Sequence, residues 1–249
     1  QLAGENKLNM TCLALNLSDY VNGVAKRHAE VSRRMFPGYA VHAVTNGVHA
    51  STWTSLPIAA MYDQHVPGWR HEPELLSRAD RIPDDTLWAA HQQAKQALVD
   101  KVRELTGVAL NPGQPILGFA RRMTAYKRAD LLFTDLARLK AIAGKHPLQI
   151  VLAGKAHPKD EAGKSLIEAL HAHMRELSGL IPMAFLPDYD MDLALLMVSG
   201  SDVWLNTPLR PLEASGTSGM KAAFNGVPQF SVLDGWWVEG LLEGVTGWA

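Results

Sequence analysis

Glu213-Ala-Ser-Gly-Thr-Ser-Gly-Met-Lys221 is a stretch rich in glycine and hydroxyl residues that lies between two short apolar runs. The first run, Asp202-Val-Trp-Leu-Asn-Thr207, is closed by Pro208 and Pro211, and the second extends from Phe230 to Leu233. Short apolar runs bounded by turn residues are typical of buried strands. The order therefore predicts a strand, a glycine-rich turn, a short helix and a second strand.

The glycine-rich turn has the composition of a site for an anion or an aldehyde. Gly216 and Gly219 let backbone N–H groups converge, because no Cβ stands in the way. Three hydroxyls add to these donors at the expected helix N-terminus, where the helix dipole favours an anion: Ser215, Thr217 and Ser218. Lys221 in such a place is either a phosphate-binding ammonium or an amine positioned for an aldehyde. A turn that only connects two elements has the same spacing, so this alternative stays open.

The motif Glu-Ala-Ser-Gly-Thr-x-x-Met-Lys, followed by Leu233-Asp-Gly235, resembles the pyridoxal-phosphate segment of α-glucan phosphorylases, which act on glycogen, starch and maltodextrin. In that family the lysine forms a Schiff base with pyridoxal 5′-phosphate, which implies this role for Lys221. The family's glutamate binds a hydroxyl of the glucosyl unit, which implies Glu213. Ser218-Gly219 stands where the family usually has Gly-Asn, as in a shorter bacterial type of these enzymes.

The resemblance also assigns some residues of the turn to the cofactor and others to the substrate. It implies cofactor contacts at Thr217 and Ser218, and contacts with the sugar at Ser215 and Gly216. The same family implies an α-1,4-glucan, inorganic phosphate and glucose 1-phosphate as partners, with a homo-oligomeric full-length enzyme.

Composition excludes several other classes of protein. The chain has 249 residues, of which 47% are hydrophobic and 20% charged, and this is ordinary for a globular protein with one large or two small domains. The formal net charge of −1 gives no bulk attraction to nucleic acid or to a membrane surface, so we expect neither as a partner. Cys12 is the only cysteine, which excludes an internal disulfide and favours a cytoplasmic location. We expect no metal site.

Both ends of the sequence suggest a segment of a longer enzyme. The chain begins at Gln1 and ends at Gly247-Trp-Ala249, directly after an apolar stretch. By resemblance we expect residues 1–45 to be the mostly helical tail of an N-terminal lobe with the crossover, and residues 46–249 to be the C-terminal lobe that binds cofactor and phosphate.

The segment around the expected domain crossing holds further candidate residues. Helical spacing of apolar residues predicts a mostly helical stretch from Leu8 to Arg34, and alternation predicts a strand over Val41–Val48. Thr45-Asn-Gly47 resembles a phosphorylase segment whose asparagine contacts the sugar and whose tryptophan, seven residues later, lies near the cofactor. This implies Asn46 and Trp53. His49-Ala-Ser-Thr52 replaces the family's Thr-Pro-Arg-Arg and makes His49 a further candidate.

From Gln114 onward the sequence alternates between strands and helices. Such alternation predicts parallel strands with right-handed crossovers and a site at their carboxyl ends. We therefore predict an α/β fold with a doubly wound parallel sheet, the Rossmann-like lobe of the two-lobed GT-B glycosyltransferase fold that the resemblance implies. The expected strands are Ile116–Ala120, Leu148–Ala153, Pro182–Leu186 and Val203–Leu205. The expected helices are Pro57–His65, Glu72–Ala79, Pro83–Glu104, Ala125–Ala143, Asp160–Leu177 and Met191–Val198.

Four cations fall within Arg121-Arg-Met-Thr-Ala-Tyr-Lys-Arg128, at the end of one expected strand. Cations are disfavoured at the positive end of the helix expected to follow, and a bound anion would remove that conflict. A solvated helix face is the alternative. The run resembles the family's Lys-Arg-x-x-x-Tyr-Lys-Arg segment, which implies that Arg122 and Lys127 grip the substrate phosphate. Arg121 stands where the family has a lysine near the cofactor phosphate.

Two shorter matches complete the resemblance. Gly154-Lys-Ala-His-Pro158 matches the family's Gly-Lys-Ala-x-Pro, and we expect Lys155 either to be structural or to support a site residue without contacting substrate or cofactor. Phe185-Leu-x-x-Tyr189 resembles a strand and tyrosine beside the cofactor, which implies Tyr189.

The activity that the resemblance implies is reversible phosphorolysis of α-1,4-glucan with retention at the anomeric carbon, with Lys221, Arg122 and Lys127 as catalytic residues. Two other hypotheses stay open at the level of sequence. One is a nucleotide-sugar glycosyltransferase of the same two-lobed fold, such as a glycogen or starch synthase, which does not need Met220-Lys221 as an aldehyde site. The other is a non-catalytic glucan-binding module.

Overall fold

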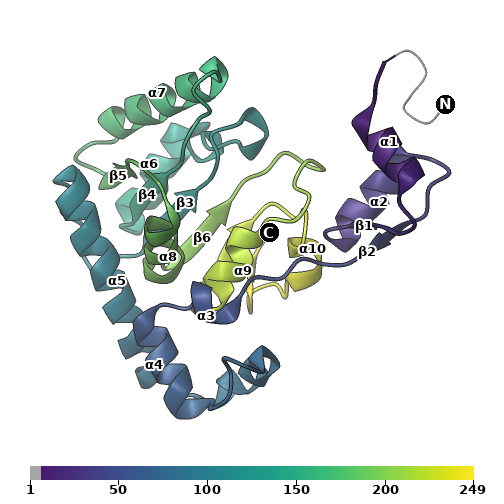
Figure 1. The fold of residues 1–249 in the computed structure, drawn as a ribbon. Coiled ribbons are helices and arrows are strands. Elements are labelled where there is room, and N and C mark those ends of the chain that lie inside the picture. Colours follow the sequence, from purple (N-terminus) through teal and green to yellow (C-terminus); the bar gives the residue numbers. More distant parts are fainter. Residues whose placement is uncertain (1–6) are drawn as a thin grey trace.

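The computed structural model describes residues 7–249, so residues 1–6 of the predicted segment 1–45, Gln1 included, lie outside the described residues. A six-stranded parallel sheet forms the centre, in the order β5-β4-β3-β6-β7-β8 (Figure 1). The strand bounds are β3 (Ile116–Ala120), β4 (Gln149–Ala153), β5 (Met183–Leu186), β6 (Val203–Asn206), β7 (Gln229–Ser231) and β8 (Gly247–Trp248). Connectivity reverses between β3 and β6, because the chain adds β4 and β5 on one side and later strands on the other.

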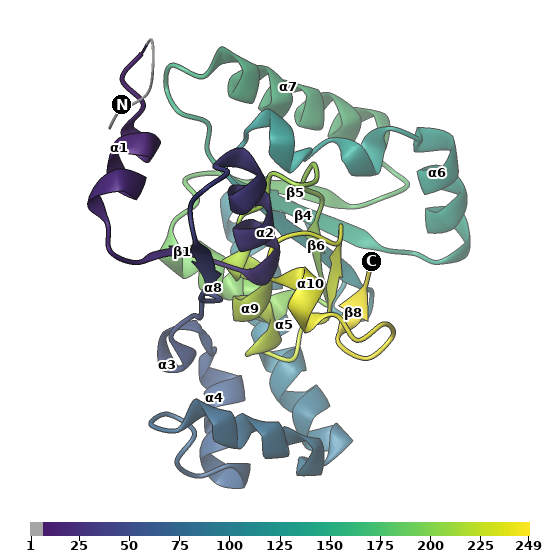
Figure 2. The same ribbon diagram turned by 90° about the vertical axis from the view of Figure 1, so that its right-hand side faces the viewer.

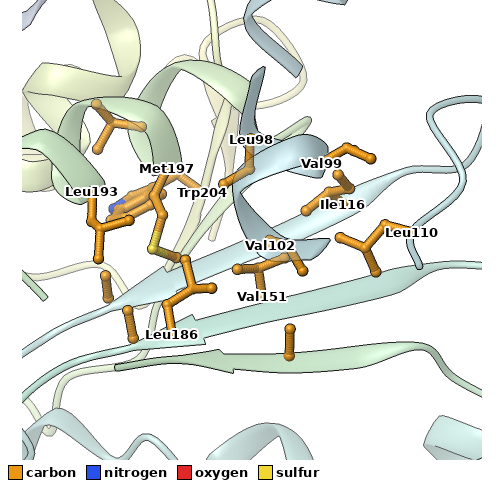
Figure 3. Packing of buried hydrophobic residues seen from close by; sticks show 14 of the residues in the cluster. Leu98, Val99, Val102, Leu110, Ile116, Val151, Leu186, Leu193, Met197 and Trp204 are labelled. Carbon is orange, nitrogen blue, oxygen red and sulfur yellow. The ribbon is translucent and has the colours of Figure 1, made fainter. Parts of the chain in front are cut away.

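Both faces of the sheet are covered by helices. On one face pack α5 (Asp84–Thr106), α8 (Met191–Gly200) and α9 (Thr217–Ala223), and on the other α6 (Leu136–Lys145) and α7 (Glu161–Glu176). Strand β4 shows how the sequence achieves this, since Val151 and Ala153 belong to the first cluster and Ile150 and Leu152 to the second. Figure 3 shows the first cluster, where Leu98 and Val102 of α5 lie above Val151. Each such fully buried aliphatic side chain stabilises the fold by roughly 1.5–3 kcal/mol.

A smaller helical unit extends from the N-terminal end of α5. It consists of α4 (Leu56–His65) and the 3-10 segment η1 (Pro73–Arg81), which pack around the fully buried indole of Trp69. The first residues of α5 carry Asp84 and Asp85, which suit the positive end of the helix dipole. At the other end Gly107 adopts the left-handed conformation that commonly closes a helix.

The N-terminal elements stand to one side of the central sheet (Figures 1 and 2). They are α1 (Met10–Leu17), β1 (Val21–Gly23), α2 (Lys26–Met35) and β2 (Val41–Ala43), with β1 and β2 paired in parallel. The carboxylate of Glu239 in α10 (Trp237–Gly240) accepts hydrogen bonds from Lys26 N at 2.9 Å and Thr45 Oγ1 at 2.8 Å. An extended stretch then leads to α3 (Ala50–Trp53).

Most predicted elements are confirmed with shifts of one or two residues, but the helix predicted over Ala125–Ala143 was wrong. Two short 3-10 turns, η2 (Ala125–Lys127) and η3 (Leu131–Phe133), precede α6. Arg128 interrupts the helix because its backbone is left-handed, with φ of 45°. Its guanidinium donates to the carbonyls of Thr207 at 2.9 Å and Pro208 at 2.9 Å, which fixes the bend against the end of β6.

Three other predictions need correction. The stretch Leu8–Arg34 is not one mostly helical segment, because β1 separates α1 from α2. The strand predicted over Val41–Val48 ends at Ala43, because only three residues have a pairing partner in β1. The segment Glu72–Ala79 forms the 3-10 helix η1 and not an α-helix.

Candidate active site

The carboxyl end of the sheet brings together side chains from four segments that are far apart in the sequence. Arg121 follows β3, Glu213 follows β6, Lys221 lies on α9, and Asp234 follows β7. Glu213 pairs with Arg121, and its backbone N–H donates to Asp234 Oδ2 at 3.0 Å. Lys221 lies close enough for the charge of Arg121 to help lower its pKa. The strand ends therefore build one cluster, as the sequence predicts.

A buried ion pair forms the centre of this cluster. Nζ of Lys127 lies 2.6 Å from Oε2 of Glu213, and the two side chains are only 7% and 6% exposed. The ammonium also lies 4.6 Å from the ring centroid of Tyr126. An ion pair at this depth loses both hydration shells, so each partner depends on the other for its charge to be tolerated.

Arg121 is a second buried cation, and it is poorly partnered. Its Nη2 lies 3.8 Å from Oε2 of Glu213, which is beyond hydrogen-bond distance, and its Nε and Nη2 have no hydrogen-bond partner among the described residues. Burial lowers the pKa of the Arg121 guanidinium, and the carboxylate of Glu213 acts in the opposite direction. The phenol of Tyr189 lies near this charge, and burial raises the pKa of Tyr189 to about 12. A buried guanidinium with free donors is suited to an anion such as phosphate.

Close packing of the backbone holds Arg121 in place. Arg121 N donates to Ala153 O at 3.3 Å and Met123 N to Lys155 O at 3.0 Å, which continues the pairing of β3 and β4 beyond the strands. At Gly154 a Cβ would lie 2.0 Å from the carbonyl oxygen of Arg121. The glycine of the Gly154-Lys-Ala-His-Pro158 motif is therefore required by packing. The side chain of Lys155 is exposed.

Lys221 projects from α9 onto an aromatic ring. Its Nζ lies 3.5 Å from the ring centroid of Trp53, the last residue of α3. Burial, and behind it the charge of Arg121, lowers the pKa of the Lys221 ammonium. A lowered pKa increases the fraction of neutral amine, which is the form that reacts with an aldehyde. The structure thus places Trp53 and Lys221 in direct contact.

The glycine-rich turn is shaped by two close approaches. Gly216 caps α9 with a left-handed φ of 86°. At Gly219 a Cβ would lie 1.4 Å from Oε1 of Gln229, so a larger residue there would displace the buried side chain of Gln229 on β7. The Ser218 hydroxyl accepts a 3.2 Å hydrogen bond from the indole of Trp204, whereas the buried hydroxyl of Ser215 has no hydrogen-bond partner in the described part of the chain. Thr217 is the first residue of α9.

The remaining predicted site residues lie further out. Arg122 is exposed, and within residues 7–249 it forms no ion pair or side-chain hydrogen bond. Asn46 lines a pocket of ≈ 520 Å³ together with Met220 and Trp236, next to the helix that carries Lys221. His49 caps α3, because its Nδ1 accepts from Thr52 N at 3.3 Å and lies 2.7 Å from Thr52 Oγ1.

The helix expected to begin beside Arg121 and Arg122 is absent from the described residues. Arg121 and Arg122 do not lie at the start of an α-helix, because the segment after β3 is irregular up to η2. The conflict between cations and a helix dipole therefore does not exist. The unpartnered nitrogens of buried Arg121 replace it as the structural reason to expect an anion.

Comparison with known proteins places the chain in a family. Residues 1–245 match the carbohydrate phosphorylase family. The chain belongs to this family. A maltodextrin phosphorylase of Thermococcus litoralis is 42% identical over 98% of the chain, and a glycogen phosphorylase of Aquifex aeolicus is 42% identical over 97%. A glycogen phosphorylase of Mycobacterium tuberculosis is 38% identical over 97%.

This phosphorylase-family chain spans about a third of the length of the curated relatives it matches. The aligned region is 32% of the Thermococcus protein, 39% of the Aquifex protein and 31% of the Mycobacterium protein. Among the described residues no helix is both long and apolar enough to cross a lipid bilayer.

The candidate site contains a residue, Asn225, that the sequence did not single out. Asn225 is 1% exposed, and its Nδ2 donates to the carbonyls of Trp53 at 2.6 Å and Lys221 at 2.9 Å. Its Oδ1 accepts from Ser55 N at 2.8 Å. Asn225-Gly226 has the pattern of an ordinary turn, and only its place one helical turn after Lys221 hints at a role.

Proposed function

We propose that the protein that carries this chain is an α-glucan phosphorylase. It would transfer the terminal glucosyl unit of an α-1,4-glucan to inorganic phosphate, reversibly and with retention, to give α-D-glucose 1-phosphate. The observation that carries the proposal is the buried cluster in which Glu213 faces Lys127 and Arg121, with the amine of Lys221 nearby. The names of the relatives agree with it, since they are glycogen and maltodextrin phosphorylases.

Pyridoxal 5′-phosphate fits the residues present. It needs an amine for its aldehyde and donors for its phosphate, and Lys221 has a lowered pKa while buried Arg121 has free Nε and Nη2 atoms. Lys221 and Arg121 would hold the cofactor, with Thr217, Ser218, Tyr189 and Trp53 around it. When bound, its phosphate supplies a group that exchanges a proton with substrate phosphate, and a phosphate pKa of ~6 suits that exchange at neutral pH.

The residues of this chain would hold the substrate phosphate next to the phosphate of the cofactor. We assign the substrate phosphate to Arg122 and Lys127. Two phosphates ~4 Å apart repel by ~4 kcal/mol at intermediate dielectric, and the charges of Arg121, Arg122 and Lys127 would offset this.

The glucosyl unit is assigned to a separate set of groups at the same strand ends. Glu213 would accept from a sugar hydroxyl, and the unpartnered hydroxyl of buried Ser215 is available as a further partner. Gly216 leaves room beside Glu213, since a Cβ there would lie 3.4 Å from Glu213 Cγ. Asn46 is assigned to the sugar as well, and it lines a pocket together with Met220 and Trp236.

The arrangement of domains is part of the proposal. We assign the sheet to the doubly wound Rossmann type, and the order β5-β4-β3-β6-β7-β8 supports this, because ligands of such sheets bind where the strand order reverses. We assign residues 46–249 to the C-terminal lobe of a GT-B fold and residues 1–45 to the tail of the N-terminal lobe. The proposal includes a cytoplasmic, homo-oligomeric enzyme, with no nucleic acid or membrane as a partner.

The test is an assay of the protein that carries this chain, supplied with pyridoxal phosphate. Maltoheptaose and inorganic phosphate should yield glucose 1-phosphate. Reduction with borohydride and peptide mapping should place a phosphopyridoxyl group on Lys221, with the exposed Lys155 as an internal control. A protein that ignores phosphate and consumes a nucleotide sugar would support the synthase-like alternative. One that binds glucan without turnover would support the non-catalytic alternative.

A further inference from the structure

The ion pair between Lys127 and Glu213 joins two residues that the proposed function assigns to different substrates. Lys127 is assigned to phosphate, and Glu213 to a hydroxyl of the glucosyl unit. The same oxygen of Glu213, Oε2, accepts the 2.6 Å hydrogen bond from the ammonium. While this hydrogen bond is formed, Lys127 is less available to phosphate and Glu213 is less available to the sugar.

The backbone around both residues is held firmly, so neither side chain can withdraw by moving its segment. Glu213 N donates to Asp234 Oδ2 at 3.0 Å, and Trp236 N donates to Ser215 O at 2.8 Å. The carbonyl of Lys127 accepts from Thr207 Oγ1 at 3.0 Å. Exchange of partners must therefore occur at the two side chains themselves.

Arg121 does not compensate for this pairing. It lies 3.8 Å from the same Oε2 atom, compared with 2.6 Å for Lys127, and within residues 7–249 its Nε and Nη2 have no hydrogen-bond partner. Arg121 is therefore free to take an anion without losing a hydrogen bond, whereas Lys127 is not. The competition between an anion and a carboxylate is confined to Lys127.

We propose that Glu213 competes with phosphate for Lys127, and that this competition makes the glucosyl unit and phosphate bind cooperatively. A sugar hydroxyl that donates to Glu213 Oε2 draws on its negative charge and loosens its hold on the ammonium. Lys127 then becomes available to phosphate. Binding free energies are reciprocal, so phosphate on Lys127 also makes Glu213 a better acceptor for the sugar. Glu213 is thus a positioning residue for the phosphate site as well as a sugar ligand.

The identity of the two substrates rests on the proposed function, but the competition itself needs only an anion. The test therefore uses sulfate, which cannot react, and isothermal titration calorimetry on the protein that carries this chain. Glu213→Gln removes the competing charge and should tighten sulfate binding ~10-fold, which corresponds to one charge-assisted hydrogen bond. In the double variant with Lys127→Met this gain should vanish. Glu176→Gln is the matched control, because it removes one charge from an exposed pair with Lys140 and should leave sulfate binding unchanged.

Glucose provides the second arm of the experiment. It should tighten sulfate binding to the wild type, by no more than the gain seen in Glu213→Gln, and should have no such effect in that variant. If Glu213→Gln does not fold, Glu213→Asp carries the test, because its shorter carboxylate withdraws from Lys127 and should also tighten sulfate binding.

The outcomes separate this inference from the proposed function. Unchanged or weaker sulfate binding in the folded variant overturns the competition, even where the wild type carries out phosphorolysis. Tighter sulfate binding in a protein without phosphorolysis upholds the competition and refutes the assigned activity.

Discussion

Replacing Asn225 by alanine removes the side chain that holds α9 against the end of α3. The three hydrogen bonds of Asn225, at 2.6, 2.9 and 2.8 Å, connect it to backbone groups of Trp53, Lys221 and Ser55. In the alanine variant the N–H of Ser55 and the carbonyl of Trp53 lose their partners. Each buried backbone group left unsatisfied costs ~1–3 kcal/mol.

Two such groups give an expected loss of at least ~2 kcal/mol in the free energy of unfolding. Urea denaturation measures it as a lower midpoint with an unchanged slope. The matched control is Gln96→Ala, which removes an exposed 2.8 Å hydrogen bond to Asp100 on α5 and should change stability by no more than ~0.5 kcal/mol.

A second measurement separates positioning from stability alone. Asn225 holds the backbones of both residues in the contact between Lys221 Nζ and the ring of Trp53. We expect slower labelling of Lys221 by pyridoxal phosphate and borohydride in Asn225→Ala, under conditions where the variant is fully folded. The reasoning would be refuted if the free energy of unfolding fell by less than ~1 kcal/mol and the labelling rate stayed unchanged. Such a result would show that the three hydrogen bonds neither stabilise the fold nor position Lys221.

Three further predictions concern charged residues. Glu213→Gln should slow phosphorolysis and leave the cofactor's absorption band intact, and loss of the band with unchanged sugar affinity would contradict its assignment. Burial acts to raise the pKa of Asp202, but hydrogen bonds from His91, Lys95 and Ile116 N outweigh it and lower that pKa. Its stabilisation is therefore present above the unfolded pKa of ~3.9 and lost as pH falls through the lower folded value, so acid melting curves of Asp202→Asn should depend less on pH. Arg122→Ala should lower kcat/KM for phosphate at least ~10-fold, and Arg122→Lys should restore only part of this loss. An unchanged dependence of the rate on phosphate concentration would show that Arg122 does not bind substrate phosphate.

The alternation of strands and helices from Gln114 onward was readable from the sequence because each strand is a short apolar run between turn residues. Strand β4 is buried at all five positions, and such a run has one simple interpretation. The same local signals failed over Ala125–Ala143, where apolar spacing fits a helix. There the left-handed Arg128 is stabilised by carbonyls 79 and 80 residues away, which no local pattern contains.

In the candidate site, too, local sequence patterns predicted some features, whereas contacts between distant segments could not be predicted. The motif from Glu213 to Lys221 indicated which residues gather at the strand ends, and the structure places them there. The pairing of Lys127 with Glu213, 86 residues apart, could not be predicted, because it depends on how two segments cross. His49 was a candidate by its position in the sequence, whereas its ring nitrogen is engaged in capping α3.

Arg121 and Arg122 differ in burial, and the proposed function needs such a difference, because it requires the site to keep one phosphate and exchange another. Arg121 is 10% exposed and has free donors, so an anion there replaces lost hydration and should be held tightly. Arg122 is exposed, so an anion there keeps part of its hydration and should exchange with solvent more readily than one at Arg121. A tightly held anion suits a resident cofactor, and a weakly held one suits a substrate that must leave after each turnover. Adjacent arginines can therefore serve opposite requirements because one faces the interior and the other faces solvent.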